Sequence, residues 1–134
     1  MFVIFKQINC HHSIACNDHI CQLMVADKNP VIYLLQEPYY NKYGRLVSIP
    51  KGYNTFGERK SRSAIVAPAF MNLVYSHEYS TADITVCLLD LGDKKTYILS
   101  GYLDINKDPI HPNLVKLADF VASSNGEAIY GLDS

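Results

Sequence analysis

The sequence lacks several features that mark common classes of protein. Its 134 residues carry a formal net charge of -1, so no whole-molecule basic field holds nucleic acid, and such a partner would need a local basic patch or a metal ion. No apolar run approaches the roughly 18 residues of a membrane span. The opening stretch, MFVIFKQINC, is too short and acquires a charge too early to form a signal peptide. We therefore expect an intracellular protein that makes no contact with a membrane.

Cysteine is scarce, and its spacing matches no CxxC motif. The chain has four cysteines, Cys10, Cys16, Cys21 and Cys87, and each lies in a predicted apolar element. Reduced, buried thiols are therefore expected. The sequence also has no P-loop, no GxGxxG and no GxSxG nucleophile elbow, so the motifs of several nucleotide-binding and serine-hydrolase families are missing.

The composition and the order of the predicted elements are those of one α/β domain. Apolar residues make up 49% of the chain and charged residues 19%. A chain of this length can bury about two thirds of the surface that it exposes when unfolded, which is enough for a core. Strands are predicted at 2–9, 31–36, 63–68, 84–91, 95–103 and 128–134, and 72–77 is a candidate for another. The segment 38–62 has little periodicity and is expected to be a loop.

Two helices are predicted from apolar residues that recur at helical spacing. The first begins after Ser13 as N-cap and ends at Asn29-Pro30. The second spans about 113–124 and ends at Gly126. Their expected apolar faces are Cys16, Ile20, Leu23 and Met24 in the first helix, and Leu114, Leu117, Ala118 and Val121 in the second. Strands 84–91 and 95–103 should form a hairpin that turns at Gly92-Asp93.

Polar side chains follow the carboxyl ends of four predicted strands. They are Gln7 and Asn9, Gln36 and Glu37, Tyr102, and Asp133. In open α/β sheets this edge is where ligands bind. Glu37 and Asp133 carry the oxygen ligands that Mg²⁺ prefers, Asn9 could hold a phosphate oxygen or a metal-bound water, and Tyr102 could donate a hydrogen bond to one. Loops are polar for ordinary reasons, so the set is more informative than any single member.

One segment, 39–62, combines basic and aromatic side chains. The basic residues are Lys42, Arg45, Lys51, Arg59, Lys60 and Arg62, and Tyr39, Tyr40, Tyr43, Tyr53 and Phe56 lie between them. Such a loop could follow a phosphate backbone or stack on exposed bases, and an ordinary solvated loop is the alternative. His11 and His12 follow the first strand, close to the sheet edge that carries the polar residues, and are further candidates for contact with phosphate.

A different set of candidate ligands lies within residues 10–21. Three cysteines and three histidines fall there: Cys10, His11, His12, Cys16, His19 and Cys21. Zinc takes four such ligands, and Cys16 with His19 forms an i, i+3 pair on one helical face. However, Cys16 belongs to the apolar stripe, Cys10 ends a strand, and no recognised ligand spacing is completed. A structural zinc is therefore the weaker alternative.

Five short motifs occur in an order that resembles a known family. They are QIN at 7–9, LLQEPY at 34–39, RSAI at 62–65, SGYL at 100–103 and YGLDS at 130–134. The sequence thereby resembles the endonuclease/exonuclease/phosphatase superfamily, and specifically the apurinic-type endonuclease of non-LTR retrotransposons. The resemblance implies a nuclear, Mg²⁺-dependent (or Mn²⁺-dependent) enzyme that nicks DNA to prime reverse transcription. It implies that Glu37 is the metal ligand, Asn9 the active-site amide, Tyr102 the phenol that contacts phosphate, and Asp133 the acid that positions the attacking water.

The sequence also departs from the family pattern. The family domain is about twice as long, and its second half supplies a further metal-side Asp and an Asp-His pair that contacts the scissile phosphate. The final family motif continues from Asp-x to Asn, whereas this sequence stops at Ser134. Position 11 is His, where many relatives carry Asp. Residues 1–134 are therefore expected to form a single, incomplete domain with part of an active site.

The resemblance implies a four-layer sandwich in which two sheets pack face to face with helices outside. This chain is expected to supply half of it, as one mixed β-sheet with two helices on one face. The other face, with runs such as VIYLL and ITVCLL, would be a bare apolar surface larger than soluble monomers usually expose. A second copy of the chain, or a missing C-terminal half, is expected to cover it.

Three functions remain open from the sequence. The first is the N-terminal portion, or a truncated derivative, of a Mg²⁺-dependent DNA endonuclease that is inactive alone. The second is a catalytically dead module that binds nucleic acid or protein, with a homodimer as one form that it could take. The third is a small interaction module stabilised by zinc.

Overall fold

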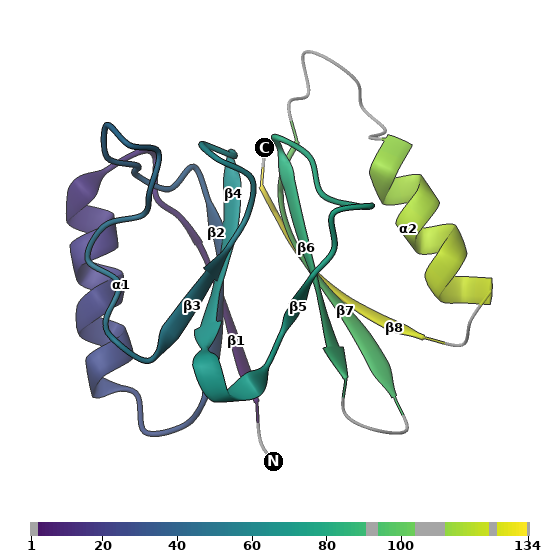
Figure 1. Ribbon diagram of the computed structural model, residues 1–134, viewed down its shortest axis with the longest axis horizontal. Helices are drawn as coiled ribbons and strands as arrows, with labels where there is room; N and C mark the ends of the chain where they lie inside the picture. Colours follow the sequence, from purple (N-terminus) through teal and green to yellow (C-terminus); the bar gives the residue numbers. More distant parts are fainter. Residues whose placement is uncertain (1–2, 91–93, 104–111, 124–125, 134) are drawn as a thin grey trace.

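Two four-stranded sheets packed face to face, with one helix outside each, make up the fold (Figure 1). The computed structural model describes residues 3–90, 94–103, 112–123 and 126–133. The elements in chain order are β1 (Ile4–Asn9), α1 (Ile14–Ala26), β2 (Val31–Gln36), β3 (Tyr53–Phe56), β4 (Ser63–Pro68), the 3₁₀ turn η1 (Ala69–Met71), β5 (Val74–Tyr75), β6 (Ile84–Asp90), β7 (Lys95–Tyr102), α2 (Pro112–Ser123) and β8 (Glu127–Asp133).

The first sheet has the strand order β1-β2-β4-β3. Strands β1 and β2 are parallel, with Ile4 opposite Val31, and α1 connects them as parallel pairing requires. Strand β4 runs antiparallel to both β2 and β3. All six residues of β2 are buried, because both of its faces are covered, and this explains its uninterrupted apolar run.

The second sheet has the strand order β5-β6-β7-β8. Strands β6 and β7 pair antiparallel with Ile84 opposite Gly101, which confirms the predicted hairpin pairing; its turn at Gly92-Asp93 lies outside the described residues. Strand β8 pairs parallel to β7, and α2 precedes it. Each sheet therefore contains one parallel pair, β1 with β2 and β7 with β8, and within each pair the two carboxyl ends lie at the same edge of the sheet.

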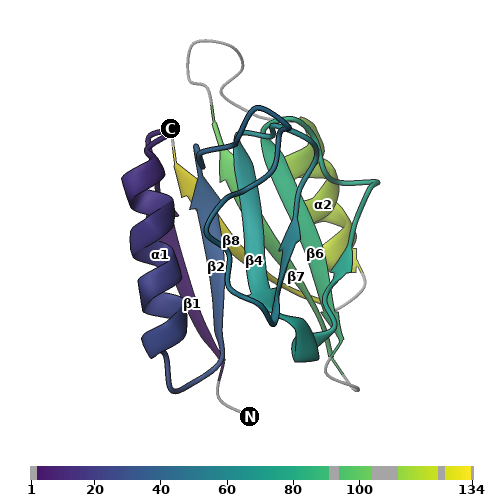
Figure 2. The same ribbon diagram turned by 60° about the vertical axis from the view of Figure 1, so that its left-hand side comes forward.

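Three apolar clusters fill the spaces between the layers. In the first, Ile20 and Met24 of α1 pack on the outer face of β2 and β4, and in the third, Leu117 of α2 packs on the outer face of β6 and β7. The middle cluster joins the inner faces of the two sheets and consists of Ile32, Leu34, Ile65, Ala67, Leu73, Cys87, Leu89 and Ile98. Figure 2 shows the two helices on opposite sides of the paired sheets.

The α/β class with mixed sheets and two helices is confirmed, but the arrangement differs from the expected single sheet with both helices on one face. The chain forms two sheets, and each helix covers a different outer face. The inner apolar face of β2 packs against β7 and β8 of the same chain, so a second copy or a C-terminal half is not needed to cover it. Strands that are apolar on both faces have the same sequence pattern in one large sheet or in two stacked sheets, which is why the pattern did not distinguish them.

Several local predictions are confirmed and others are wrong. Ser13 is the N-cap of α1, although its side chain forms no capping hydrogen bond. The segment 38–62 is not entirely loop, because β3 forms within it and pairs with β4. Ala118 is exposed rather than part of the packed face of α2. Cys10 and Cys87 are buried as expected, whereas Cys16 and Cys21 are half-buried.

A close approach between the sheets depends on Gly131 of β8. A Cβ placed at Gly131 would lie 2.7 Å from Cδ1 of Leu34 in β2. Next to it, the buried Gln36 Nε2 donates to the carbonyl of Gly131 (3.0 Å) and to Ser100 Oγ (3.0 Å). Ser100 Oγ in turn donates to the carbonyl of Leu35 at 2.8 Å. This network joins the two sheets directly beneath the edge that carries the polar residues.

None of the helices in the described part of the chain has the length and apolar character needed to cross a membrane.

Candidate active site

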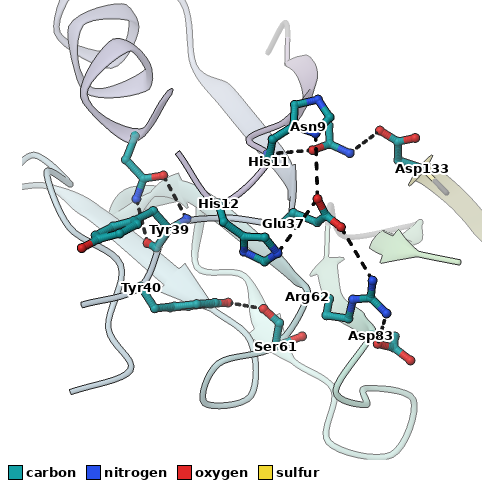
Figure 3. Close-up of polar contacts among 11 residues, drawn as sticks. Asn9, His11, His12, Glu37, Tyr39, Tyr40, Ser61, Arg62, Asp83 and Asp133 are labelled. Atoms are coloured by element: carbon teal, nitrogen blue, oxygen red, sulfur yellow. Dashed lines mark hydrogen bonds and ion pairs between the residues drawn. The ribbon is translucent and has the colours of Figure 1, made fainter. Parts of the chain in front are cut away.

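Three of the four strand-end residues singled out in the sequence meet where the two sheets join (Figure 3). Asn9 ends β1, Glu37 follows β2, and Asp133 ends β8. Asn9 Nδ2 donates a hydrogen bond to Asp133 Oδ2 at 2.7 Å, although the two residues are 124 positions apart and belong to different sheets. The fourth, Tyr102, ends β7 opposite Asp133 in the parallel register.

Both polar groups of the Asn9 amide are engaged. Its Nδ2 donates to Asp133, and its Oδ1 accepts the backbone N–H of His11 at 2.9 Å. Gln7, on the same strand, donates from Nε2 to the carbonyl of Leu132 at 2.7 Å. The amide of Asn9 thus has a defined orientation, and the edge of β1 is attached to the edge of β8 at two points.

The backbone at Glu37 is held in an unusual conformation. Glu37 has φ +48°, and His11 and His12 have φ values of +48° and +57°. Such left-handed conformations cost on the order of 1 kcal/mol or more for residues with a Cβ, and they collect at functional sites. The conformation is stabilised by hydrogen bonds from the Glu37 N–H to the carbonyl of Arg62 and from the His12 N–H to the carbonyl of Glu37, both 2.7 Å. The consequence is that the Glu37 side chain leaves its strand toward the site rather than continuing the pleat.

The Glu37 carboxylate lies among nitrogen-bearing side chains from three segments. Arg62 Nη2 is 3.7 Å from Oε1, His11 Nδ1 is 3.9 Å from Oε2, and His12 Nε2 is 4.0 Å from Oε2. The carboxylate side chain is only 15% exposed. All three separations exceed a hydrogen-bond length, so none of these nitrogens occupies a lone pair of the carboxylate.

Arg62 connects the first sheet with the second. Its Nη1 lies 4.0 Å from Asp83 Oδ1, and its guanidinium carbon lies 3.8 Å from the centroid of the Tyr102 ring. A guanidinium over an aromatic face is a favourable cation–π geometry. The arginine therefore holds Glu37 on one side and Asp83 with Tyr102 on the other.

Asp83 is a site residue that the sequence did not reveal. It lies just before β6, and its carbonyl accepts the backbone N–H of Tyr102 at 2.9 Å. Nothing in its local sequence distinguishes it from the other aspartates, since its position depends on the packing of the second sheet on the first.

The basic candidates divide into two groups. His11 and Arg62 belong to the site around Glu37. Lys60 lines a neighbouring hollow with His12, whereas Arg59 lines a separate cavity beside Gly44 and Gly57. The basic-aromatic segment thus does not form one continuous patch at Glu37, and only its last member reaches the carboxylate.

The side chains at the site fit a Mg²⁺ ion that takes some of its ligands from the protein and the others from substrate and water. Mg²⁺ is commonly bound by one or two carboxylates together with substrate phosphate and water. Glu37 has that chemistry, and Arg62, His11 and His12 all lie beyond hydrogen-bond distance of its oxygens. Within the described residues, no group of three or more His, Cys, Asp and Glu side chains is placed to hold a metal by itself. A cage made only of protein ligands is therefore not what these residues provide.

The soft ligands of residues 10–21 do not assemble into a zinc site in the described structure. Cys10 is buried, and burial together with its contact to Cys16 raises the pKa of its thiol. His19 is exposed on α1. A buried thiol and an exposed imidazole face different surroundings, so these two candidate ligands are not gathered at one site.

A comparison with solved structures identifies a protein of similar fold. No protein-family model and no curated protein matches the sequence. Among solved structures, the endonuclease domain of TRAS1, a telomere-specific non-LTR retrotransposon, superposes with a TM-score of 0.68 and 18% sequence identity. The match covers 96% of this chain and 57% of that one, so the chain spans little more than half of the domain that it matches. The chain therefore has the fold of part of a non-LTR retrotransposon endonuclease domain, the endonuclease/exonuclease/phosphatase-type sandwich that its motifs resemble.

Proposed function

We propose that this chain is part of a DNA endonuclease that hydrolyses a phosphodiester bond with Mg²⁺ or Mn²⁺, as in target nicking by non-LTR retrotransposons. The observation that carries the proposal is the 2.7 Å hydrogen bond between Asn9 and Asp133 at an edge shared by two sheets, next to Glu37 and Arg62. Two carboxylates, an amide and a guanidinium from distant parts of the chain meet there, and such groups can position a water and stabilise negative charge on a phosphate.

Asp133 is proposed to position the attacking water and to accept its proton. The Asn9 amide donates a hydrogen bond to Oδ2 of this carboxylate, and a carboxylate within reach of the water is a group that can accept its proton. Attack on phosphorus breaks the bond to the 3′ oxygen and leaves a 3′-hydroxyl and a 5′-phosphate. Asn9 also limits rotation of the carboxylate, so the water would be held in one direction.

Glu37 would hold the metal ion, which when bound would stabilise negative charge on the scissile phosphate. Arg62 and Tyr102 would act on the same phosphate from the other side. A guanidinium forms charge-assisted hydrogen bonds with phosphate, and a phenol hydroxyl can donate one more. Their stacking at 3.8 Å fixes both groups before substrate arrives, which reduces the reorganisation needed in the transition state.

Activity of the 134 residues by themselves is expected to be low. The chain spans 57% of the matched endonuclease domain, and the resemblance assigns further catalytic groups to the remaining part. Loss of members of a catalytic unit typically reduces rates by orders of magnitude. DNA binding, which depends on fewer groups, should be retained.

The test is nicking of supercoiled plasmid in Mg²⁺ by the purified chain, by Glu37→Ala and by Glu127→Ala. Glu127 is an exposed control at the start of β8, where it pairs with Lys94. Nicking that is lost only in Glu37→Ala supports the proposal. Equal nicking by all three proteins would contradict it. If none nicks, Mn²⁺ binding followed by electron paramagnetic resonance decides, and the proposal requires that Glu37→Ala weakens it.

A second candidate is a catalytically inactive module that binds nucleic acid. The observation in its favour is that Arg62, 3.7 Å from Glu37, already supplies a positive charge beside the carboxylate. Such a module would bind DNA equally well with and without divalent metal, and Glu37→Ala would leave that binding unchanged.

A further inference from the structure

The turn at residues 41–45 is held in one conformation by Asn41. Asn41 Oδ1 accepts the backbone N–H groups of Tyr43 (2.9 Å) and Arg45 (3.1 Å). The Asn41 backbone N–H donates to the carbonyl of Arg45, and the Asn41 carbonyl accepts the N–H of Gly44, both at 2.9 Å. Gly44 has φ +75°, which a glycine adopts without strain. The backbone that carries Arg45 is therefore fixed before any ligand binds.

Four basic side chains gather at this turn. Lys42 and Arg45 belong to it. Arg59 and Lys60 rest against it, because a Cβ placed at Gly44 would lie 2.8 Å from Arg59 Nε and 3.3 Å from Lys60 Cγ. All four side chains are exposed to solvent. These four residues, here called the basic turn cluster, come from two separate stretches of the segment 39–62, so the folding of the loop brings them together.

The basic turn cluster carries an excess of positive charge. Within the described part of the chain, none of its four cations forms an ion pair with a carboxylate. Three hollows of the described structure border the turn, and Glu58 is the only acidic residue that lines them. Four cations and one carboxylate amount to a local formal charge of +3, whereas the whole chain carries -1. The cluster is therefore the local basic patch that a chain without a basic field needs to bind nucleic acid.

Lys60 connects the basic turn cluster with the candidate active site. It lines a hollow of about 400 Å³ together with His12 and Tyr40. His12 Nε2 in turn lies 4.0 Å from Glu37 Oε2 (Figure 3). On its other side, Lys60 contacts the turn at Gly44. A polymer with one phosphate at Glu37 would thus pass Lys60 and then reach the turn.

The far end of this path is an open hollow that two arginines line. It has a volume of about 700 Å³, and its lining residues are Tyr43, Gly44, Arg45, Gly57 and Arg59, with no acidic residue among them. A guanidinium forms charge-assisted, often bidentate hydrogen bonds with phosphate. The two glycines allow a bulky ligand to approach the backbone closely. The hollow therefore suits the phosphates of a polymer.

We propose that Arg45 and Arg59 bind backbone phosphates of a DNA duplex whose scissile phosphate lies at Glu37, and that Lys42 and Lys60 add to the attraction. This inference rests on the proposed function and adds which surface of the chain the duplex covers. The phosphates of a duplex lie on its outside, so exposed arginines reach them while every base pair stays stacked. Contacts to phosphate position the duplex and carry no sequence information, so binding here should not depend on base sequence.

The test measures binding of a short, fluorescently labelled duplex of mixed sequence to the full chain by anisotropy. EDTA is present so that no cleavage occurs, and salt is varied between about 50 and 200 mM. The variants are Arg45→Gln/Arg59→Gln, which removes both charges, and Arg45→Lys/Arg59→Lys, which keeps them. The control, Lys28→Gln/Lys95→Gln, removes two exposed charges near the amino ends of β2 and β7, away from the site. Circular dichroism checks that each variant is folded.

The glutamine variant of the two arginines should bind the duplex about tenfold more weakly at the lowest salt concentration. Its slope of log affinity against log salt should fall in magnitude by about 1.8, which corresponds to two lost phosphate contacts with duplex DNA. The lysine variant should keep the slope of the wild type, because it keeps both charges. The control should match the wild type in affinity and in slope.

Equal losses in the glutamine variant and in the control would overturn the inference, because only the total charge of the chain would then matter. A loss in the lysine variant as large as in the glutamine variant would overturn it too, since packing against Gly44 and not charge would be responsible. Absence of duplex binding by the wild type would do the same. Failure of the proposed function is measured separately, by Mn²⁺ binding that does not depend on Glu37. Duplex binding through the arginines and metal binding through Glu37 can each be found without the other.

Discussion

The site around Glu37 and the segment 10–21 each contain several side chains that could bind a ligand, but only around Glu37 do side chains from distant parts of the chain come together. Asn9 and Asp133 form a 2.7 Å hydrogen bond across 124 positions of sequence. In the segment 10–21, by contrast, six potential zinc ligands lie within one turn and one helix, and in the described structure they form no metal-holding group. Ligands that are neighbours in the sequence of a helix point in different directions around it. Residues at the ends of neighbouring strands, by contrast, lie side by side at one edge of the sheet.

The difference teaches which structural feature creates the site. Parallel strands β1 and β2 end at the same edge, and so do β7 and β8. Packing of one sheet on the other then superimposes the two edges. Each of the following predictions tests one contribution to this convergence, beginning with the packing that has the largest expected effect.

Gly131→Val should disturb the contact between the sheets most strongly. The new side chain would overlap Leu34, since even a Cβ would lie 2.7 Å from its Cδ1. Overpacking of this kind costs typically about 1–3 kcal/mol, and urea unfolding should show the loss. The same substitution in a Leu34→Ala background should cost less, because the overlap with Cδ1 is removed and only the contact with Cβ of residue 34, at 3.0 Å, remains. An equal cost in both backgrounds would mean that the sheets do not pack through Gly131.

Arg62→Gln should have a smaller effect on stability and a distinct effect on metal binding. The arginine side chain is 32% exposed and the Glu37 side chain 15%, so loss of their interaction is expected to lower the free energy of unfolding by about 1 kcal/mol. Removing the internal positive charge should raise the affinity of Glu37 for Mn²⁺ several-fold, measured by electron paramagnetic resonance. Arg62→Lys, which keeps the charge, is the control and should bind Mn²⁺ as the wild type does. Weaker Mn²⁺ binding in Arg62→Gln would show that the arginine supports the metal site instead of competing with it.

The segment 10–21 should give the smallest effect. Replacing Cys16, which is half-buried against the first cluster, and the exposed His19 by Ser and Gln is expected to lower the free energy of unfolding by about 0.5–1 kcal/mol, and by the same amount with and without added zinc. The measurement is a thermal melt in EDTA and in equimolar Zn²⁺. A zinc-dependent rise in melting temperature that is absent in the variant would revive the zinc alternative.

A large part of the secondary structure followed from local pattern. The runs 31–36 and 63–68 are β2 and β4 at the predicted bounds, and Ser13 is the N-cap of α1. Strand β3 was missed because Tyr53–Phe56 is short, half of it is exposed, and glycines stand on both sides. Its strand conformation depends on the free edge of β4, which local pattern does not contain.

The candidate site was predictable in its members and not in its arrangement. Glu37, Asn9, Tyr102 and Asp133 were identified because polar side chains follow apolar strands, and Asn9 and Asp133 then proved to be in direct contact. Asp83 and the bridging position of Arg62 were not foreseen, since both depend on which residues of the second sheet face the first. Lys60 and Arg59, which the sequence grouped with Arg62, line other hollows.

The sequence by itself determined the class of fold, most of the strands and the chemical types of side chain at their ends, because apolar periodicity and chain breaks are local properties. The tertiary structure alone decided that there are two sheets, that their inner faces cover each other, and that Asn9 reaches Asp133. The physical reason is that a strand apolar on both faces can be buried by many partners. Only the packing of complete layers, down to the missing Cβ of Gly131, selects one of them.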